Sequence, residues 1–158
     1  MNLYPFETRG PKPEWYRRAM AQFGIDADKV NVFFLDDVSE EDWTVPAAYI
    51  LKMPPNYILS RHGHACERFE VVVRGELHVG DGRVAKPGDV FTAKANTLYG
   101  PHTAGPEGCV TVEVFGRLDA MSTMLYEGSD GQILAADALK GEFPPDYVPT
   151  PDEMDVAL

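Results

Sequence analysis

The sequence has only two cysteines, no excess of basic residues and no long hydrophobic run. Cys66 and Cys109 are too few for a disulfide scaffold and do not form a CxxC pair, so free thiols are expected. Lys and Arg number 14 against 25 Asp and Glu, a net charge of -11, which repels nucleic-acid phosphates and anionic lipid headgroups. No apolar run approaches the roughly 20 residues of a membrane helix, and the first residues do not resemble a signal peptide. We therefore expect a cytoplasmic protein that binds neither nucleic acid nor membranes.

The middle of the chain has the pattern of many short β-strands. Its 158 residues suffice for one domain with a real core. From position 43 to position 115, short apolar segments alternate with turns that contain Gly or Pro, and Asp81-Gly82 is a strong hairpin signal. Residues 108–115 form the clearest strand, because valines alternate with other residues there. This pattern predicts an all-β sandwich or barrel.

The flanking segments are less regular. A helix is predicted over residues 14–23, with Trp15, Ala19 and Phe23 on one stripe and Gly24 as a possible C-cap. Residues 30–35 read as a short strand, residues 118–125 as a strand or a short helix, and residues 133–139 as a short helix. We divide the chain into an N-terminal arm and helix (1–41), a β-barrel core (42–118) and a C-terminal extension (119–158), all in one domain.

Two histidines stand at i and i+2 in the segment RHGHACERFEVVVRG. Residues two apart on an extended chain share a face, so His62 and His64 can converge on one ion, with Glu67 or Glu70 as an oxygen donor. A third histidine, His102, follows a predicted turn over residues 86–89. The two histidines alone also fit a polar surface loop, and His102 also fits a core histidine with its hydrogen bonds satisfied.

The order of HxH, carboxylate, glycine, PGD turn and histidine resembles the cupin superfamily. The likeness covers about residues 53–115, and the segment YGPHTAGPEGC resembles a subgroup of small single-domain cupins. The resemblance implies a jelly-roll β-barrel with a short N-terminal and a short C-terminal helix. It also implies a divalent transition metal held by three histidines and one carboxylate, with Fe(II) favoured and Mn, Ni or Zn as other choices.

The upstream motif departs from the usual cupin spacing, because Arg68 fills the slot of the ligand glutamate. Arg68 and Glu70 share one strand face, so Glu70 is the expected carboxylate ligand and Glu67 should point outward. A buried ion pair with Arg68 is an equally good reading of Glu70. Arg68 itself is a candidate for binding a substrate carboxylate.

The downstream motif departs as well, because the usual third histidine falls on Tyr99. His102 is then the expected metal ligand, since a Gly100-Pro101 bend can redirect the backbone between the two. Tyr99 is a candidate hydrogen-bond donor or acid at the site, and ordinary packing in the barrel is its alternative.

The resemblance favours a metal-dependent enzyme that acts on a small carbonyl- or enol-bearing molecule, with dioxygenase-type chemistry first. A cupin isomerase or lyase, or a non-catalytic small-molecule-binding cupin, remains open, because the fold hosts many functions. We also expect a homodimer. The arm over residues 1–13 and the acidic, proline-rich tail after residue 142 carry apolar residues without the periodicity of a core, and sheet edges need cover.

Overall fold

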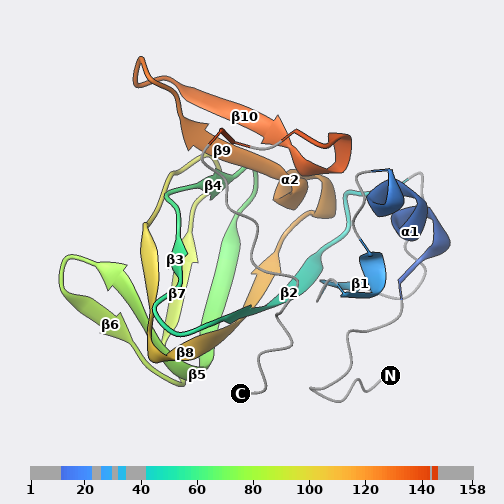
Figure 1. Cartoon of the computed structure of the whole chain (residues 1–158). Coiled ribbons are helices and arrows are strands. Elements are labelled where there is room, and N and C mark those ends of the chain that lie inside the picture. The colour runs from blue at the N-terminus through green and yellow to red at the C-terminus, as the bar shows by residue number, and fades with distance from the viewer. Residues whose placement is uncertain (1–11, 23–25, 30–31, 35–41, 143, 146–158) are drawn as a thin grey trace.

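The structure is a computed structural model, which describes residues 12–22, 26–29, 32–34, 42–142 and 144–145. Strands in antiparallel sheets make up most of it, with short helices at either end of the chain (Figure 1). The all-β prediction is therefore confirmed. No helix in the described ranges is long and apolar enough to cross a membrane.

In the described part of the chain, the larger sheet has seven strands built around two long antiparallel partners, β5 (Arg68–Gly80) and β8 (His102–Phe115). Its main path runs β1-β2-β8-β5-β6, while β3 pairs with β8 and β7 pairs with β5. The remaining strands of this sheet are β1 (Val32–Phe34), β2 (Ala47–Met53), β3 (Ile58–Leu59), β6 (Arg83–Ala85) and β7 (Val90–Ala93). The sheet thus places segments from both halves of the chain around one interior.

The smaller sheet joins β4 (Gly63–His64), β9 (Thr123–Glu127) and β10 (Ile133–Asp137) in the order β10-β9-β4. Figure 1 shows it across one end of the larger sheet. The predicted helix over 133–139 is wrong, because β10 pairs along its whole length with β9 and only a 3-10 turn, η2 (Ala138–Lys140), follows. The short helix in this half of the chain is α2 (Leu118–Ser122), which lies within the ambiguous segment 118–125.

The N-terminal helix α1 (Glu14–Ala21) begins after Pro13, as predicted. The expected end at residues 23 and 24 lies outside the described residues. Trp15 stacks on Trp43 with ring centroids 4.9 Å apart. Together with Tyr16 and Met20, it packs in a cluster that includes Ala47 and Leu118. A 3-10 turn, η1 (Ala27–Lys29), lies beyond α1.

Turn residues connect the strands where the sequence predicts them. Asp81 and Gly82 both have positive φ, which a two-residue hairpin turn with left-handed residues requires, and they join β5 to β6. In the PGD turn, Asp89 N donates to Lys86 O at 2.8 Å, and Lys86 N donates to the Asp89 carboxylate at 2.8 Å.

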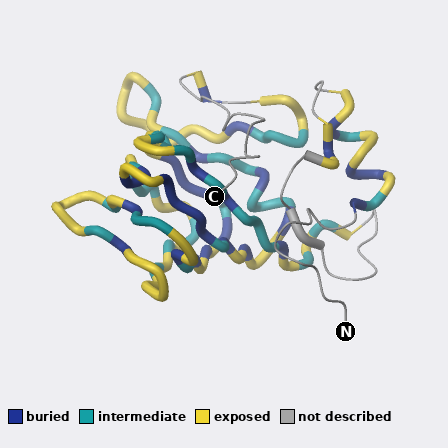
Figure 2. Tube along the Cα trace, turned by 60° about the horizontal axis from the view of Figure 1, so that its bottom comes forward, coloured by how far each residue is buried: buried dark blue, intermediate teal, exposed yellow. Residues whose placement is uncertain are grey.

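The two faces of β5 differ sharply in exposure. Arg68, Glu70 and Val72 are buried, while Phe69 and Val73 are exposed, as the two-residue period of a strand requires. In Figure 2 the buried residues lie along the central strands, and the exposed residues lie at the hairpin turns. An apolar cluster around Leu51, Met53 and Val72 occupies one part of this interior, and polar side chains occupy another.

Candidate functional site

His62 and His64 are both buried and lie where the two sheets meet. His64 belongs to β4 and is paired with Met124 of β9. His62 forms a bridge with Tyr99, in which each backbone N–H donates to the other residue's carbonyl, at 3.1 and 2.8 Å. Gly63 between them has no room for a side chain, because a Cβ there would lie 2.4 Å from the Thr97 carbonyl oxygen. The HxH segment is therefore pressed closely against the chain before Tyr99.

The hydrogen bonds of His62 and His64 define which ring nitrogen is free. Nδ1 of His62 lies 2.7 Å from Ser60 O, and Nδ1 of His64 lies 2.6 Å from Met121 O. A carbonyl oxygen only accepts, so Nδ1 must carry the proton in both rings. Nε2 then keeps its lone pair, which is the arrangement that backbone carbonyls impose on metal-ligating histidines.

The surroundings hold the three histidines in the neutral form. Burial lowers the pKa of His64 to about 3, and the neighbouring His62 adds to this effect. Burial and the Arg68 charge lower the pKa of His102 to about 4. Burial also lowers the pKa of His62. Neutral imidazole is the form that binds a metal.

Tyr99 contacts all three imidazoles. Its ring centroid lies 4.7 Å from that of His62, 5.7 Å from that of His102 and 6.4 Å from that of His64. Gly100, with φ of 86°, provides the bend that brings His102, the first residue of β8, to the same interior. Tyr99 is partly exposed as a residue, but its hydroxyl is buried, and this burial raises the pKa of the phenol. The structure thus brings Tyr99, His62, His64 and His102 together.

Arg68 lies at the centre of a buried charge cluster. Its Nη1 donates to Glu113 Oε2 at 2.7 Å, and its Nη2 lies 2.7 Å from Glu70 Oε2. The face of the guanidinium covers Tyr99, with Cζ 4.0 Å from the ring centroid. Two of its three nitrogens therefore contact carboxylates, so a substrate carboxylate would have to compete with Glu70 and Glu113.

The contact between Arg68 and Glu70 is an ion pair without hydrogen-bond alignment, because Glu70 Oε2 has no hydrogen-bond partner. Burial and the nearby Glu113 raise the pKa of Glu70 to about 8. Glu70 and Glu113 are directly opposite in the β5–β8 register, where two like charges repel. The structure thus places Glu70 against Arg68, which is the alternative to metal ligation.

Several buried polar atoms near this cluster have no hydrogen-bond partner among the described residues. They are Tyr99 Oη, His102 Nδ1, Arg68 Nε, Glu70 Oε2 and Thr111 Oγ1. Buried polar atoms are rarely left without a partner. An interior in which these five atoms make no hydrogen bond is suited to receive a polar ligand.

The imidazole donors of this site suit a divalent transition metal in their chemistry, but the distances between the donor side chains suit it less well. Neutral imidazoles with fixed tautomers suit Fe, Mn, Ni or Zn, and the rings of His62 and His64 lie 5.4 Å apart. Among the described side chains, however, no three of His, Cys, Asp or Glu lie close enough together to hold an ion. His62 and His64 thus form a donor pair, and the Tyr99 ring lies against both this pair and His102.

The remaining candidates lie away from the imidazoles or carry no visible role. Glu67 is exposed, as the alternation predicts, and His78 on β5 is exposed too. Cys66 and Cys109 are free and buried. Glu113 is the site residue that no motif indicated. Its signal was its place in the clearest predicted strand, where it shares a face with Thr111 and Phe115, but strand alternation alone does not say which residue it meets.

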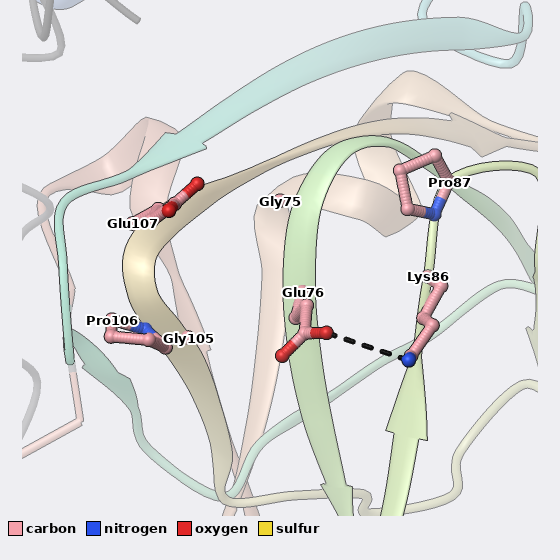
Figure 3. A pocket seen from close by; sticks show the side chains of 8 residues that line it. Gly75, Glu76, Lys86, Pro87, Gly105, Pro106 and Glu107 are labelled. Atoms are coloured by element: carbon pink, nitrogen blue, oxygen red, sulfur yellow. Dashed lines mark ion pairs between the residues drawn. The ribbon is translucent and has the colours of Figure 1, made fainter.

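A separate hollow of about 370 Å³ lies where β5, β6 and the bend of β8 meet. Figure 3 shows the ion pair of Glu76 and Lys86 across it, with Glu107 on the facing strand. These side chains are largely exposed and none of the histidines lines this hollow. The candidate site is therefore the imidazole cluster.

No protein-family model and no curated protein matches this sequence. An RmlC-like cupin protein from Ralstonia eutropha JMP134 is 22% identical over 58% of this chain and 57% of its own, with a TM-score of 0.44. An acetylacetone dioxygenase from Acinetobacter johnsonii is 17% identical over 65% of this chain and 68% of its own, with a TM-score of 0.45. KdgF from a Halomonas species is 26% identical over 49% of this chain and 74% of its own, with a TM-score of 0.43.

The likeness to these solved structures extends over part of each chain. The all-β part of the expectation drawn from HxH, PGD and YGPH is confirmed by the antiparallel strand topology. In this chain the segments that carry HxH and YGPH meet directly, through the backbone bridge of His62 and Tyr99.

Proposed function

We propose that this chain is a metal-dependent cupin enzyme that acts on a small carbonyl- or enol-bearing molecule, with dioxygenase-type chemistry favoured. His62 and His64 would hold a divalent transition metal, Fe(II) first, and His102 is the proposed third donor. The observation that carries the proposal is the pair of Nδ1 hydrogen bonds to Ser60 and Met121, which leaves both Nε2 atoms as acceptors. A bound metal would supply Lewis-acid or redox chemistry at the open positions.

Tyr99 and Arg68 are the proposed substrate-orienting residues. Because burial raises the pKa of Tyr99, its hydroxyl is protonated near neutral pH and can donate a hydrogen bond to a carbonyl or enolate oxygen. Arg68 keeps one donor, Nε, without a partner. Both groups lie in a buried interior, where a hydrogen bond to a substrate is not weakened by water. Glu70, held against Arg68, is left out of the proposed donor set.

The second candidate function is non-catalytic binding of a small molecule, and a specific observation favours it. The described residues do not bring a third donor to the histidine pair, and a guanidinium lies in the same interior. In this reading, the unpaired Tyr99 hydroxyl and Arg68 Nε bind the ligand without a metal.

Metal analysis separates the two candidates. The protein would be purified without added metal and without a nickel column, then analysed by inductively coupled plasma mass spectrometry. A stoichiometric metal that is lost in His62→Ala and His64→Ala, and kept in the matched control His78→Ala, whose side chain is exposed on β5, supports the enzyme. Protein that stays metal-free after anaerobic Fe(II), Mn(II), Ni(II) and Zn(II) reconstitution supports the binding module.

We also propose a homodimer. The arm and tail that first suggested it lie mostly outside the described residues, so the proposal now rests on exposed apolar side chains of the larger sheet, among them Phe69 and Val114.

A further inference from the structure

Glu113 is a buried carboxylate that no sequence motif indicated. It lies on β8, directly opposite Glu70 of β5, and only 5% of its surface is exposed. Its Oε2 accepts a hydrogen bond from Arg68 Nη1 at 2.7 Å. Hydrogen bonds between a guanidinium and a carboxylate are about twice as strong as neutral ones, so Glu113 restrains the Arg68 side chain firmly.

Arg68 in turn restrains Tyr99. The guanidinium carbon lies 4.0 Å from the centre of the Tyr99 ring, well within the roughly 6 Å of a favourable cation–π contact. The other neighbours of that ring are the imidazoles of His62, His102 and His64. A movement of the guanidinium would therefore free the Tyr99 ring to move against all three.

Glu70 contacts the same guanidinium but is a weaker restraint. Its contact with Nη2 lacks hydrogen-bond alignment. Its pKa is raised to about 8 by burial and by Glu113, so near neutral pH it is largely uncharged. Of the two carboxylates, Glu113 is therefore the one that holds Arg68 through a hydrogen bond.

We propose that Glu113 is a positioning residue of this site, which holds the Arg68 guanidinium against Tyr99 and thereby sets where the Tyr99 ring lies among His62, His64 and His102. The inference rests on the proposed function only in taking these imidazoles as the working site. The charge of Glu113 also acts through space on His62, whose pKa it raises against the effect of burial. Glu113 makes no ring contact or hydrogen bond with an imidazole in any contact described above, so its effect on where the Tyr99 ring lies is through Arg68.

The test uses the metal-free protein and nuclear magnetic resonance of the histidine rings, so that it does not depend on activity. Glu113→Gln keeps the shape of the side chain and removes its charge. It should shift the ring signals of His62, His64 and His102 and broaden the Arg68 Nε–H signal. The exposed His78 serves as the internal reference and should not shift. Glu70→Gln, the matched control on the same guanidinium, should leave the three ring signals nearly in place.

Two results would overturn the assignment. One is a Glu113→Gln spectrum in which the three ring signals coincide with those of the wild type. The other is a Glu70→Gln spectrum that shifts them as far as Glu113→Gln does. If Glu113→Gln does not fold, Glu113→Asp replaces it, which retains the charge and retracts it by one methylene. The Arg68 Nε–H signal should then move in a folded protein, and an unmoved signal counts against the proposal.

A Co(II) titration of the same variants tells this inference apart from the proposed function. Loss of a partner that orients metal ligands commonly weakens metal affinity 10–100-fold, and for Glu113→Gln we expect about 10-fold. If neither the wild type nor the variants bind Co(II) but the ring signals shift as described, the metal proposal fails and the positioning role stands.

Discussion

Position 99 holds a tyrosine where the common cupin spacing has a histidine, and the chain provides His102 three residues later. Both side chains reach one interior and stack at 5.7 Å, because Gly100 adopts a φ of 86° between them. A neutral phenol is a poor metal ligand, since its ordinary pKa is about 10, and burial raises the pKa of Tyr99 further. The proposed division of labour thus assigns the metal to His102 and the substrate to Tyr99.

Two substitutions test this division. His102→Ala should lose most of the bound metal, because it removes a donor nitrogen. Tyr99→Phe should retain the metal and change turnover or substrate affinity only, because it removes one hydroxyl and keeps the ring. Metal content after identical reconstitution is the measurement. Metal kept by His102→Ala and lost by Tyr99→Phe would assign the ligand to Tyr99 instead.

The raised pKa of Glu70 predicts how the stability of the protein changes with pH. Its pKa in the folded protein is raised to about 8 from an unfolded value near 4.3. The folded state therefore binds this proton more tightly, so the stability that it contributes is present below about pH 4 and is lost as pH rises toward 8. Glu70→Gln, which cannot ionise, should be more stable relative to wild type at pH 8.5 than at pH 5. Urea unfolding at both pH values measures this, and an equal difference at both would contradict the raised pKa.

Some of this residue-level arrangement follows from the sequence and some does not. Strand alternation places Arg68 and Glu70 on one buried face and Glu67 on the other side, and the structure agrees. The partner of Arg68 on β8 depends on the register of β5 against β8, which sets Glu113 beside Arg68 although the two residues are 45 positions apart in the sequence. No local pattern encodes that register.

Among the elements, β10 shows where local spacing misleads. Residues 133–139 fit a helical period, but a short apolar run is ambiguous between helix and strand. The turn over 128–131, with Gly128 N donating to Gln132 O at 2.8 Å, folds the segment back on β9, and strand pairing then decides. By contrast, Asp81-Gly82 encodes its hairpin locally, and the prediction there is confirmed.

The close approach of β5 to β8 depends on Gly75. Its φ is 72°, and a Cβ would lie 2.1 Å from the Gly108 carbonyl oxygen. Gly75→Ala should therefore cost roughly 3 kcal/mol or more, through backbone strain plus a clash in a packed interior. Gly82→Ala is the matched control, because Gly82 has nearly the same φ, 71°, with nothing near its Cβ position. It should cost about 1 kcal/mol. Equal losses in chemical denaturation would mean that the close approach to Gly108 has no effect.

For the whole molecule, the three buried histidines should govern stability in mild acid. The pKa values of His62, His64 and His102 are all lowered in the folded protein, so their stabilising effect is complete above about pH 6.5 and is lost as pH falls through their folded values. Each contributes a slope of up to about 1.4 kcal/mol per pH unit. The stability that Glu70 contributes changes with pH in the opposite direction, but Glu70 is one group and the histidines are three. Urea unfolding of the metal-free protein at pH 7, 6 and 5 should show falling stability. A flat profile over that range would contradict the burial of the histidines as neutral rings.

The proposed homodimer would form through exposed apolar side chains on the larger sheet. Because the net charge is -11, two copies repel each other. This repulsion is weakest where the contact surface carries no carboxylates. Phe69 and Val114 are directly paired on β5 and β8, as are Val71 and Val112 in the next row. Phe69 is 44% exposed and Val114 is 40% exposed. In a two-fold dimer one patch meets its own copy, so a self-complementary apolar strip is the expected contact.

Phe69→Glu tests this contact, because it places two facing carboxylates in the dimer and should give a monomer. Ile133→Glu is the control, since Ile133 is 53% exposed but lies on β10 of the smaller sheet. It should leave the dimer intact. Multi-angle light scattering at high protein concentration measures the mass of each. A monomeric wild type would end the dimer proposal, and dissociation by Ile133→Glu alone would move the contact to the smaller sheet.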